Sequence, residues 1–443
     1  MRFDIPEYVE NLMNILDKNG YNSFVVGGAV RDMIMGKEPS DYDVNTDALP
    51  DDIERVFKDY RTLNVGKRFG TVVVVQEEGF VEVTTFRSDG EYLDGRRPKE
   101  VFFSDELRED LSRRDFTINA MAYNSDKGLI DYFGGVEDIE KKIIRTVGDA
   151  RERFSEDYLR ILRAVRFATQ LKFEIEDLTK EGCKLYGKNL LNISGERISS
   201  EFFKMMLSEK PSYGIRLLKE LEIIYLLLPE LTNSIGFNQY NPYHDMDVFE
   251  HSLCLLDKVS PVIHLRLAAL FHDIGKPYTF TRDEDGTGHF YGHSKVSAKI
   301  AWEILLRFKA SNKIIKKTSM LIEKHMTAYD NFSEKGLKRL LSKFGEEDIF
   351  TLLDLQEADK LCKNENRNID DLLDRRKKIE EILKESYIYE KNQLAINGND
   401  IMELGYKQGI IIGEILDYLF ERVLENPEKN NKEDLIELIK EKY

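Results

Sequence analysis

The sequence predicts an α+β protein in which a mixed β-sheet with flanking helices comes first and helices fill almost all of the remainder. Two β-branched runs, residues 71–75 and 80–86, are separated by Glu77-Glu78-Gly79, which is the pattern of a β-hairpin. After about residue 147, apolar residues recur at helical spacing. The chain has 443 residues, of which 42% are hydrophobic, so it can build several buried cores.

The first candidate site begins where an expected strand, residues 23–26, runs into Gly27-Gly28. Because glycine has no side chain, backbone N–H groups here can approach a phosphate at the beginning of the next helix, which carries Arg31. The pattern therefore predicts a site for a nucleoside triphosphate. The alternative is an ordinary Gly-Gly turn.

Acidic residues follow on a second expected strand. Asp41 and Asp43 are two apart, so both side chains point to one face with roughly 7 Å between their α-carbons. Such a pair can bind Mg²⁺ against phosphate oxygens. Glu82 lies in an otherwise apolar run and is a candidate third acid, because a buried carboxylate is costly unless it is paired or metal-bound. The alternatives are solvated carboxylates at a strand end and an outward-facing position for Glu82.

Residues 113–120, which read RRDFTINA, are expected to open a helix. The Arg114 guanidinium can bind triphosphate oxygens with two hydrogen bonds, while Asp115 accepts one from a ribose hydroxyl. Asn119 lies one helical turn further on. The alternative is an exposed helix start with an acidic residue near its N-terminus.

Asp157 and Arg160 are the predicted base-reading pair. They are three residues apart on an expected helix, so they share a face and offer an acceptor and donors to one planar base. Arg163 and Arg166 continue that face. The alternative is a plain salt bridge between Asp157 and Arg160.

In this order, the motifs at 27–32 (GGAVRD), 41–43 (DYD), 113–120 and 156–160 (EDYLR) resemble those of the bacterial class II tRNA nucleotidyltransferase and poly(A) polymerase family. Residues 395–402 resemble the C-terminal signature of its CCA-adding members. Residues 88–98 match the family's flexible loop, which helps the site switch from C to A addition; by composition alone they are a solvated loop. The resemblance implies four parts: a nucleotidyltransferase head (1–147), a helical neck (148–232), an HD-type helical domain (233–362) and a helical tail that binds tRNA (363–443).

The implied function is template-independent addition or repair of the 3′-terminal CCA of tRNA from CTP and ATP. Two Mg²⁺ ions would assist the reaction, which releases pyrophosphate. Within the same chemistry, the alternatives are addition of A alone to tRNA ending in CC, and poly(A) synthesis. From another class, the chain would be a phosphohydrolase whose head binds a nucleotide. A non-catalytic RNA-binding protein is disfavoured because both Asp41 and Asp43 are present.

A second set of residues, in the helical half, resembles the H…HD…D arrangement of HD-superfamily metal-dependent phosphohydrolases. Its members are His251, His272, Asp273 and Asp359. Imidazole nitrogens and carboxylates on separate helices can converge on a transition metal. Three more histidines are possible additional ligands: His289, His293 and His325. His244 and His264 are expected to be ordinary core or surface histidines. Hydrolysis and a purely structural, RNA-binding role both remain open for this domain.

The formal net charge of −16 argues against promiscuous RNA binding. The same acidity favours an RNA substrate engaged by its shape at a limited surface. Basic residues cluster at 145–166, where arginines at three-residue spacing on one helix face indicate a function. A second basic cluster, at 309–317, is expected to be an ordinary solvated helix face. The three cysteines, Cys183, Cys254 and Cys362, have no metal-ligand spacing and are expected to be reduced thiols. No apolar run approaches the ~20 residues that cross a bilayer, so a cytoplasmic protein without a membrane partner is expected.

Overall fold

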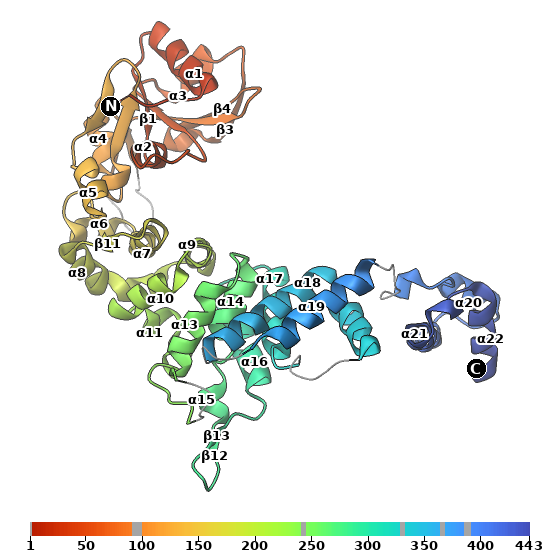
Figure 1. The fold of residues 1–443 in the computed structure, drawn as a ribbon. Coiled ribbons are helices and arrows are strands. Elements are labelled where there is room, and N and C mark those ends of the chain that lie inside the picture. Colours follow the sequence, from red (N-terminus) through yellow and green to blue (C-terminus); the bar gives the residue numbers. More distant parts are fainter. Residues whose placement is uncertain (1, 91–99, 241–244, 328–332, 364–367, 385–390) are drawn as a thin grey trace. The chain divides into compact units, whose positions relative to one another are not determined.

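The computed structural model describes residues 2–90, 100–240, 245–327, 333–363, 368–384 and 391–443. The chain forms two compact units, Met1–Pro229 and Glu230–Tyr443, called here the N-terminal and the C-terminal unit. The N-terminal unit contains the sheet and the C-terminal unit is helical, so the predicted α+β class is confirmed (Figure 1). The finer division into four parts stays a prediction. Most of the expected loop 88–98, and His244, lie outside the described residues.

A seven-stranded mixed sheet forms the centre of the N-terminal unit, in the order β3-β4-β5-β2-β1-β8-β9. Its strands are β1 (Ser23–Val26), β2 (Asp43–Thr46), β3 (Arg61–Gly66), β4 (Thr71–Val75), β5 (Phe80–Thr85), β8 (Met121–Asn124) and β9 (Gly128–Asp131). Strands β2 and β5 run parallel, whereas β4 and β5 form an antiparallel hairpin in which Val75 pairs with Phe80. The predicted hairpin is therefore confirmed.

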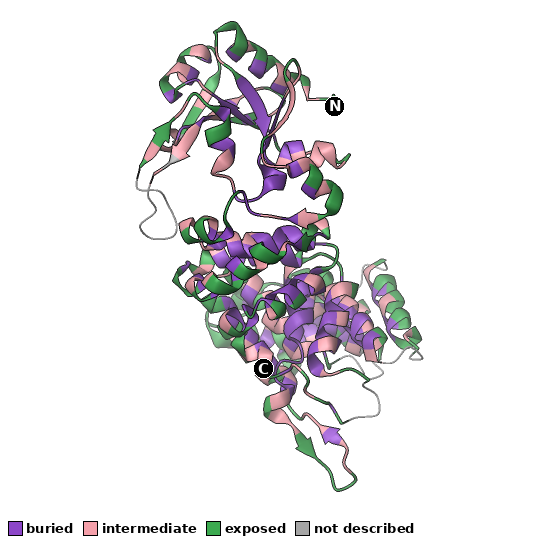
Figure 2. Cartoon of the chain, turned by 90° about the vertical axis from the view of Figure 1, so that its left-hand side faces the viewer, coloured by how far each residue is buried: buried purple, intermediate pink, exposed green. Residues whose placement is uncertain are grey.

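Short helices and strands surround this sheet: α1 (Glu7–Lys18), α2 (Gly28–Ile34), α3 (Pro50–Val56), η1 (Lys67–Phe69), β6 (Arg87–Asp89), β7 (Val101–Phe103), α4 (Leu107–Ser112), η2 (Thr117–Asn119) and α5 (Gly135–Lys141). Helix α1 buries Val9, Leu12, Met13 and Leu16, which recur at helical spacing and pack into the core formed by the sheet. Figure 2 shows buried residues concentrated along the sheet.

Helices continue the N-terminal unit beyond the sheet. They are α6 (Ala150–Glu156), α7 (Leu159–Leu171), α8 (Asp177–Tyr186), η3 (Gly187–Asn192), α9 (Gly195–Met206), α10 (Pro211–Glu220) and α11 (Ile224–Leu227), with a two-residue parallel pair, β10 (Ile143–Ile144) and β11 (Glu174–Ile175). The short helix α12 (Pro229–Thr232) begins at the last residue of this unit and continues into the C-terminal unit. Asp149 caps α6 by accepting a 2.7 Å hydrogen bond from Arg151 N. Helix α7 packs against α9 and α10. Residues of α7 and α9 line the candidate site described below.

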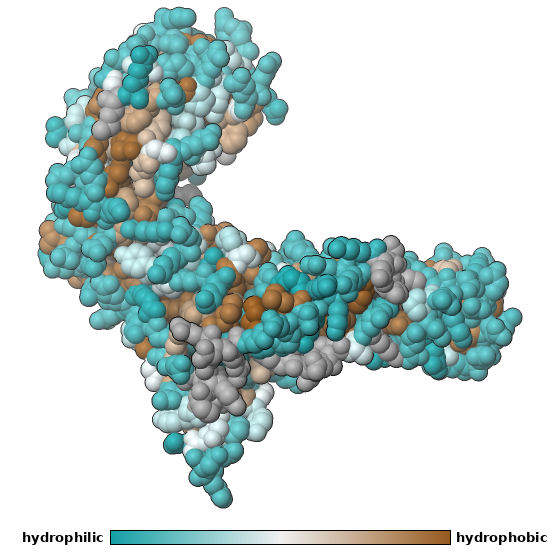
Figure 3. Space-filling view, in the orientation of Figure 1, coloured by the Kyte–Doolittle hydropathy of each residue, from teal (hydrophilic) through white to brown (hydrophobic). Residues whose placement is uncertain are grey.

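The C-terminal unit consists of α13 (Val248–Lys258), α14 (Ile263–Phe271), α15 (Lys276–Thr279), β12 (Thr281–Arg282), β13 (Gly288–His289), α16 (His293–Arg307), α17 (Asn312–Lys324), α18 (Glu334–Lys363), α19 (Asp370–Lys384), η4 (Lys391–Gln393), α20 (Gly398–Glu403), α21 (Ile410–Glu425), η5 (Pro427–Lys429) and α22 (Lys432–Lys442). Helix α18 is broken at Gly345, whose φ of 73° favours glycine. Helices α20 to α22 share a separate hydrophobic core. On the face drawn in Figure 3, hydrophilic residues cover most of this unit's surface.

The prediction of three reduced cysteines is wrong for two of them. Cys254 on α13 and Cys362 on α18 form a disulfide with their α-carbons 6.0 Å apart, while Cys183 is free and buried. The two bonded residues are 108 apart in sequence, so no local spacing indicates the bond; only the packing of α13 against α18 brings the sulfurs together. Among the described helices, none combines the length and the apolar character that crossing a bilayer requires.

Candidate functional site

An arginine-rich cavity of about 550 Å³ lies in the N-terminal unit. Its lining consists of Gly27, Gly28, Ala29, Arg31, Asp41, Asp43, Arg113, Arg114, Asp115, Asn119, Asp157, Leu159, Arg160, Arg163, Arg166, Phe167 and Arg197. All ten residues predicted to bind the nucleotide are among them, together with two of the three predicted catalytic acids. Seven arginines face four aspartates here, so the cavity is suited to a polyanion despite the acidic chain.

Gly27 connects the sheet to the cavity. It follows β1 with a φ of 73°, and a β-carbon at this position would lie 2.7 Å from Nη1 of Arg114. The positive φ therefore favours glycine, and any side chain here would also displace the end of Arg114. Helix α2 begins directly after it, so the predicted strand–glycine–helix arrangement is present.

The acidic residues lie at the edge of the cavity. Strand β2 begins at Asp43, so Asp41 precedes the strand instead of sharing it, which corrects the predicted two-residue register. Glu82 is exposed between two buried valines of β5 and is paired with Asp43 across the parallel β2–β5 ladder. It does not line the cavity, although it flanks an acid that does.

The environment of Asp43 disfavours its negative charge. Desolvation by the surrounding protein, followed by the charges of Glu82 and Asp41, raises the pKa of Asp43 to about 6, while Arg114 opposes the shift. Mutual repulsion between neighbouring carboxylates is relieved when a cation binds between them. The donor set and its electrostatics therefore fit a divalent metal ion.

The run Arg113-Arg114-Asp115 follows the end of α4 and does not open a helix as predicted. Phe116, which follows the run, has extended dihedral angles and pairs with Thr146, so the backbone is not helical here. Asp110 on α4 is buried and accepts a 2.8 Å hydrogen bond from Nη2 of Arg113 and a 2.5 Å bond from Nδ2 of Asn45. Burial raises the pKa of Asp110, but Arg113 and Arg114 outweigh burial and lower it below its usual value. An ionised carboxylate beneath the run thus holds the arginines at the cavity.

Asp115 is the centre of a buried hydrogen-bond network. Its Oδ2 accepts a 2.7 Å bond from Nε of Arg163, and its Oδ1 accepts a 3.2 Å bond from Nδ2 of Asn119. Nη1 of Arg31 in turn donates to Oδ1 of Asn119 at 2.8 Å. Burial raises the pKa of Asp115, but Arg163 and Arg160 reverse this and lower it to about 2. Because both oxygens of Asp115 already accept hydrogen bonds, this carboxylate orients Arg163 and Asn119 in the cavity.

Asp157 and Arg160 do not lie on one helix as predicted. Asp157 has extended dihedral angles and separates α6 from α7, which begins at Leu159. Nη2 of Arg197 on α9 donates a 2.7 Å bond to Oδ2 of Asp157, whereas Arg160 pairs with Glu156 and donates to the Arg113 carbonyl at 3.0 Å. The direct salt bridge between Asp157 and Arg160 is thus replaced by two separate pairs. Both residues still line the same cavity.

Two residues of the cavity escaped the sequence analysis. The ring of Phe167 lies against three guanidinium groups, with Cζ of Arg166, Arg163 and Arg31 at 3.9, 5.3 and 5.4 Å from its centroid. In the sequence Phe167 reads as an ordinary core residue of a helix. Arg197 lies 40 residues from Asp157, so no spacing pattern links them. Its Nη1 is buried without a hydrogen-bond partner among the described residues.

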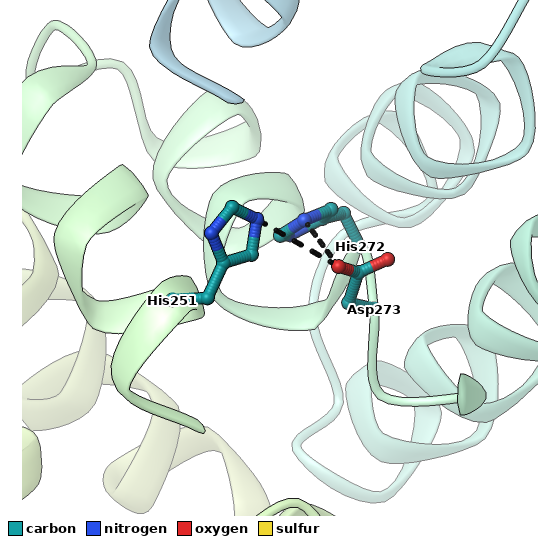
Figure 4. A group of neighbouring side chains, drawn as sticks. All are labelled: His251, His272 and Asp273. Atoms are coloured by element: carbon teal, nitrogen blue, oxygen red, sulfur yellow. Dashed lines mark ion pairs between the residues drawn. The ribbon is translucent and has the colours of Figure 1, made fainter. Parts of the chain in front are cut away.

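A second site, the histidine cluster, lies in the C-terminal unit and comprises His251, His272, Asp273, His293, His325 and Asp359. Figure 4 shows His251 and His272 directed toward Asp273, whose Oδ2 lies 3.7 and 3.0 Å from their Nε2 atoms. His251, His272 and Asp273 therefore form one potential ligand group, and Asp359, the fourth predicted residue, lies beside it, 3.0 and 3.9 Å from Nε2 of His251 and His272.

His293 and His325 extend the cluster on the other side of Asp273. Oδ1 of Asp273 lies 3.2 Å from Nε2 of His293 and 3.9 Å from Nε2 of His325. One carboxylate thus belongs to both potential ligand groups. His289 lies outside the cluster because it contacts Asp283 instead.

The backbone fixes the tautomers of three rings in the cluster. Nδ1 of His272, His293 and His325 lies 3.0, 2.8 and 2.6 Å from the carbonyl oxygens of Ala269, Phe290 and Ile322. Since a carbonyl oxygen only accepts, each Nδ1 carries the proton, and Nε2 of the neutral ring has a lone pair. These lone pairs face carboxylates and one another, with 3.3 Å between Nε2 of His293 and His325. Such an electron-rich centre calls for a cation, and backbone-oriented histidines are typical of metal ligands.

Protonation in the histidine cluster suits metal binding as well. Burial lowers the pKa of His325 to about 3, so this ring stays neutral. Burial alone raises the pKa of Asp273, but His272 and Lys276 reverse the effect and lower it well below the usual value. Lys363 and His251 do the same for Asp359. A neutral His325 beside the ionised carboxylates of Asp273 and Asp359 is a combination that a transition metal binds.

Known proteins resemble this chain over nearly its whole length. Residues 23–145 match the poly A polymerase head domain, residues 172–235 the RNA and SrmB-binding site of polymerase A, and residues 280–439 domain 2 of tRNA nucleotidyltransferase. A CCA-adding enzyme of Geobacillus sp. is 34% identical over 96% of this chain and 94% of its own length. The CCA-adding enzyme of Bacillus pumilus is 35% identical over the same shares.

Solved structures agree with this result. The Bacillus stearothermophilus CCA-adding enzyme, crystallised with CTP, is 28% identical and matches 99% of this chain and 98% of its own, with a TM-score of 0.71. A Thermotoga maritima CCA-adding enzyme complexed with tRNA has the same fold, at 22% identity and a TM-score of 0.57 over 99% of this chain. Sequence, domain content and fold lead to one conclusion: the chain belongs to the CCA-adding enzymes, a family of nucleotidyltransferases.

Proposed function

We propose that this protein adds or repairs the 3′-terminal CCA of tRNA, using CTP and ATP and releasing pyrophosphate. One observation carries the proposal: a single cavity is lined by all ten predicted nucleotide-binding residues and by Asp41 and Asp43. The CTP complex of the Bacillus stearothermophilus relative supports the choice of substrate. The protein would do this work in the cytoplasm, with tRNA as its partner.

In the proposed reaction the 3′-hydroxyl of tRNA attacks the α-phosphorus of the bound nucleotide. The backbone at Gly27 and Gly28 approaches the triphosphate, and Arg31 and Arg114 neutralise its charge. Asp115 holds Arg163 in place from beneath, as its buried position and 2.7 Å bond to Nε indicate. No covalent enzyme intermediate is needed.

Members of this family use a divalent metal, and we propose Mg²⁺ held by Asp41 and Asp43. When bound, such an ion activates the attacking hydroxyl and stabilises charge on the triphosphate. Glu82 would act from beside Asp43, by keeping the local potential negative. The raised pKa of Asp43 supports this assignment, because neighbouring like charges contribute to it.

For base selection, Asp157 would accept a hydrogen bond from an exocyclic amine, which both cytosine and adenine carry. Arg197 fixes the Asp157 carboxylate through its 2.7 Å bond, and Arg160 is held by Glu156. Uracil and guanine present keto oxygens or imino donors at the corresponding edge, so they would leave a buried polar group unpaired.

The proposal is tested with four nucleotides and three tRNA transcripts, which end before CCA, after C, and after CC. Labelled CTP should enter the first two transcripts, and labelled ATP should enter the third. Incorporation of ATP alone on the CC transcript would indicate A-only addition. Long runs of A on all three would indicate poly(A) synthesis.

Asp157→Ala should relax discrimination against UTP and GTP roughly 10- to 100-fold, because one charge-assisted hydrogen bond to the base edge is lost. Triphosphate binding should weaken less, since Gly28 and Arg114 remain. Arg197→Ala should also relax discrimination against UTP and GTP, because Asp157 loses the hydrogen bond that holds its carboxylate in place. Single-turnover incorporation of all four nucleotides measures these ratios, with Lys172→Ala, a surface change in the same unit, as the control. A uniform fall with unchanged ratios would assign Asp157 a structural role.

Incorporation should fall as the pH drops through about 6, because the metal binds the ionised form of Asp43. Glu82→Gln removes a like charge and therefore lowers the pKa of Asp43, so the midpoint should move to lower pH. More Mg²⁺ should move it the same way, because the ion competes with the proton. Rate profiles against pH, with the exposed Glu78→Gln as the control, measure the midpoint. A midpoint that stays in place for Glu82→Gln would contradict the role given to Glu82.

A second activity is supported by the histidine cluster. We propose that it holds a transition metal and hydrolyses phosphoesters, because three tautomer-fixed histidines direct lone pairs at Asp273 and at one another. When bound, the ion would supply an activated water and neutralise a phosphate oxygen. Asp273 and Asp359 are ionised and His325 is neutral before it binds. Hydrolysis of a 2′,3′-cyclic nucleotide with added Ni²⁺, Co²⁺ or Mn²⁺ tests this proposal.

A further inference from the structure

Two links join α13 and α18 at successive helical turns. His251 and Cys254 are three residues apart on α13, and Asp359 and Cys362 are three apart on α18, so each pair lies on one helix face. The first link is the 3.0 Å contact between Nε2 of His251 and Oδ1 of Asp359. The second is the Cys254–Cys362 disulfide. A covalent bond thus lies one turn from two members of the histidine cluster.

The disulfide also holds the end of α18 that carries Asp359. Helix α18 ends at Lys363, directly after Cys362. Asp359 belongs to the last turns of α18, and its Oδ2 forms an ion pair with Nζ of Lys363 at 2.5 Å. Loss of the covalent link would leave this end held to α13 by non-covalent contacts alone. Cys254 is partly exposed to solvent, so a reductant can reach the bond from its side.

We propose that the Cys254–Cys362 disulfide is a redox-sensitive clamp that sets the metal affinity of the histidine cluster. The inference rests on the metal site proposed above and adds its regulation. In the oxidised state, the bond keeps His251 and Asp359 at ligand spacing before the metal arrives. In the reduced state, the two helices separate more freely and the metal binds more weakly.

The reductant is a dithiol, such as a redox-active CXXC protein or a small dithiol. Its thiolate attacks the sulfur of Cys254, the S–S bond breaks, and the sulfur of Cys362 leaves and takes a proton. The second thiol of the reductant then displaces Cys254 from the mixed disulfide. The protein gains two electrons and two protons, and the reductant leaves as its own disulfide. Oxidation by another disulfide reverses these steps.

Co²⁺ binding to the full chain tests the clamp. The protein is stripped with a chelator, its thiols are counted, and Co²⁺ affinity is measured from the absorption of the bound ion. The disulfide-bonded form is compared with protein reduced by a phosphine, because dithiols bind metal ions themselves. Cys254→Ser with Cys362→Ser provides a permanently open form, and Cys183→Ser is the matched control. Circular dichroism verifies that each form is folded.

The oxidised form should bind Co²⁺ roughly 10- to 100-fold more tightly than the reduced form and the double variant. The control should behave as wild type, and reoxidation should restore tight binding. CTP incorporation should not change with the redox state, because its residues lie in the other unit. Equal Co²⁺ affinity in both states would overturn the clamp and leave the metal site standing. Three titratable thiols after mild oxidation would overturn the clamp as well. Absence of Co²⁺ binding in every form would refute the metal site itself, and the clamp with it.

Discussion

Asp43→Ala should lower CTP incorporation by at least roughly 10³-fold while the protein stays folded. The side chain faces the cavity and contributes nothing to the core, so its loss removes a metal ligand and no packing. Asp41→Ala should behave in the same way. Single-turnover incorporation of labelled CTP on a tRNA transcript that lacks CCA measures the loss.

Asp59→Ala is the matched control for these changes, because it is an exposed aspartate of the same unit outside the arginine-rich cavity. The midpoint temperature of thermal unfolding should be the same for the control as for the wild-type protein. For Asp43→Ala it should be unchanged or slightly higher, since removing Asp43 relieves repulsion with Glu82 and Asp41. A folded variant lacking both Asp41 and Asp43 that still incorporates CTP at a near-normal rate would eliminate the proposed site.

His272→Ala combined with Asp273→Ala should reduce metal-dependent phosphoester hydrolysis by at least roughly 100-fold. Both residues belong to the histidine cluster, and Asp273 is shared by its two ligand groups. Incorporation of CTP and ATP should be preserved, because the arginine-rich cavity lies in the other unit. Hydrolysis of a 2′,3′-cyclic nucleotide and CTP incorporation are measured on the same preparations.

His264→Ala is the control for this double variant, since His264 is a largely buried histidine of the same unit that lies outside the cluster. Both buried substitutions require a check of folding by circular dichroism. Simultaneous loss of the two activities in a folded protein would show that the sites are not independent. Unchanged hydrolysis in the double variant would show that the histidine cluster does not carry the second activity.

Local sequence patterns were sufficient to predict the fold class and much of the candidate site. The β4–β5 hairpin follows from two β-branched runs around a turn, and the strand–glycine–helix arrangement follows from the side-chain-free residues Gly27 and Gly28 after the expected strand. Most residues that line the arginine-rich cavity could also be predicted, because they belong to short contiguous motifs; Phe167 and Arg197 could not, because they lie outside these motifs.

The geometry inside each site depends on long-range packing and was not accessible. The expected i, i+3 pair of Asp157 and Arg160 assumed one continuous helix, but Asp157 adopts an extended conformation between two helices. Its true partner, Arg197, comes from α9. The disulfide likewise joins residues 108 apart, and only the tertiary structure brings their helices together.

The most direct test of the central claim is the sequence of the product formed when a transcript lacking CCA is incubated with both CTP and ATP. We expect two C residues and then one A to be added, after which extension stops. We expect Asp41→Ala and Asp43→Ala to leave the transcript unextended. A homopolymer of A, or an unextended transcript with the folded wild-type protein, would contradict CCA addition by this protein.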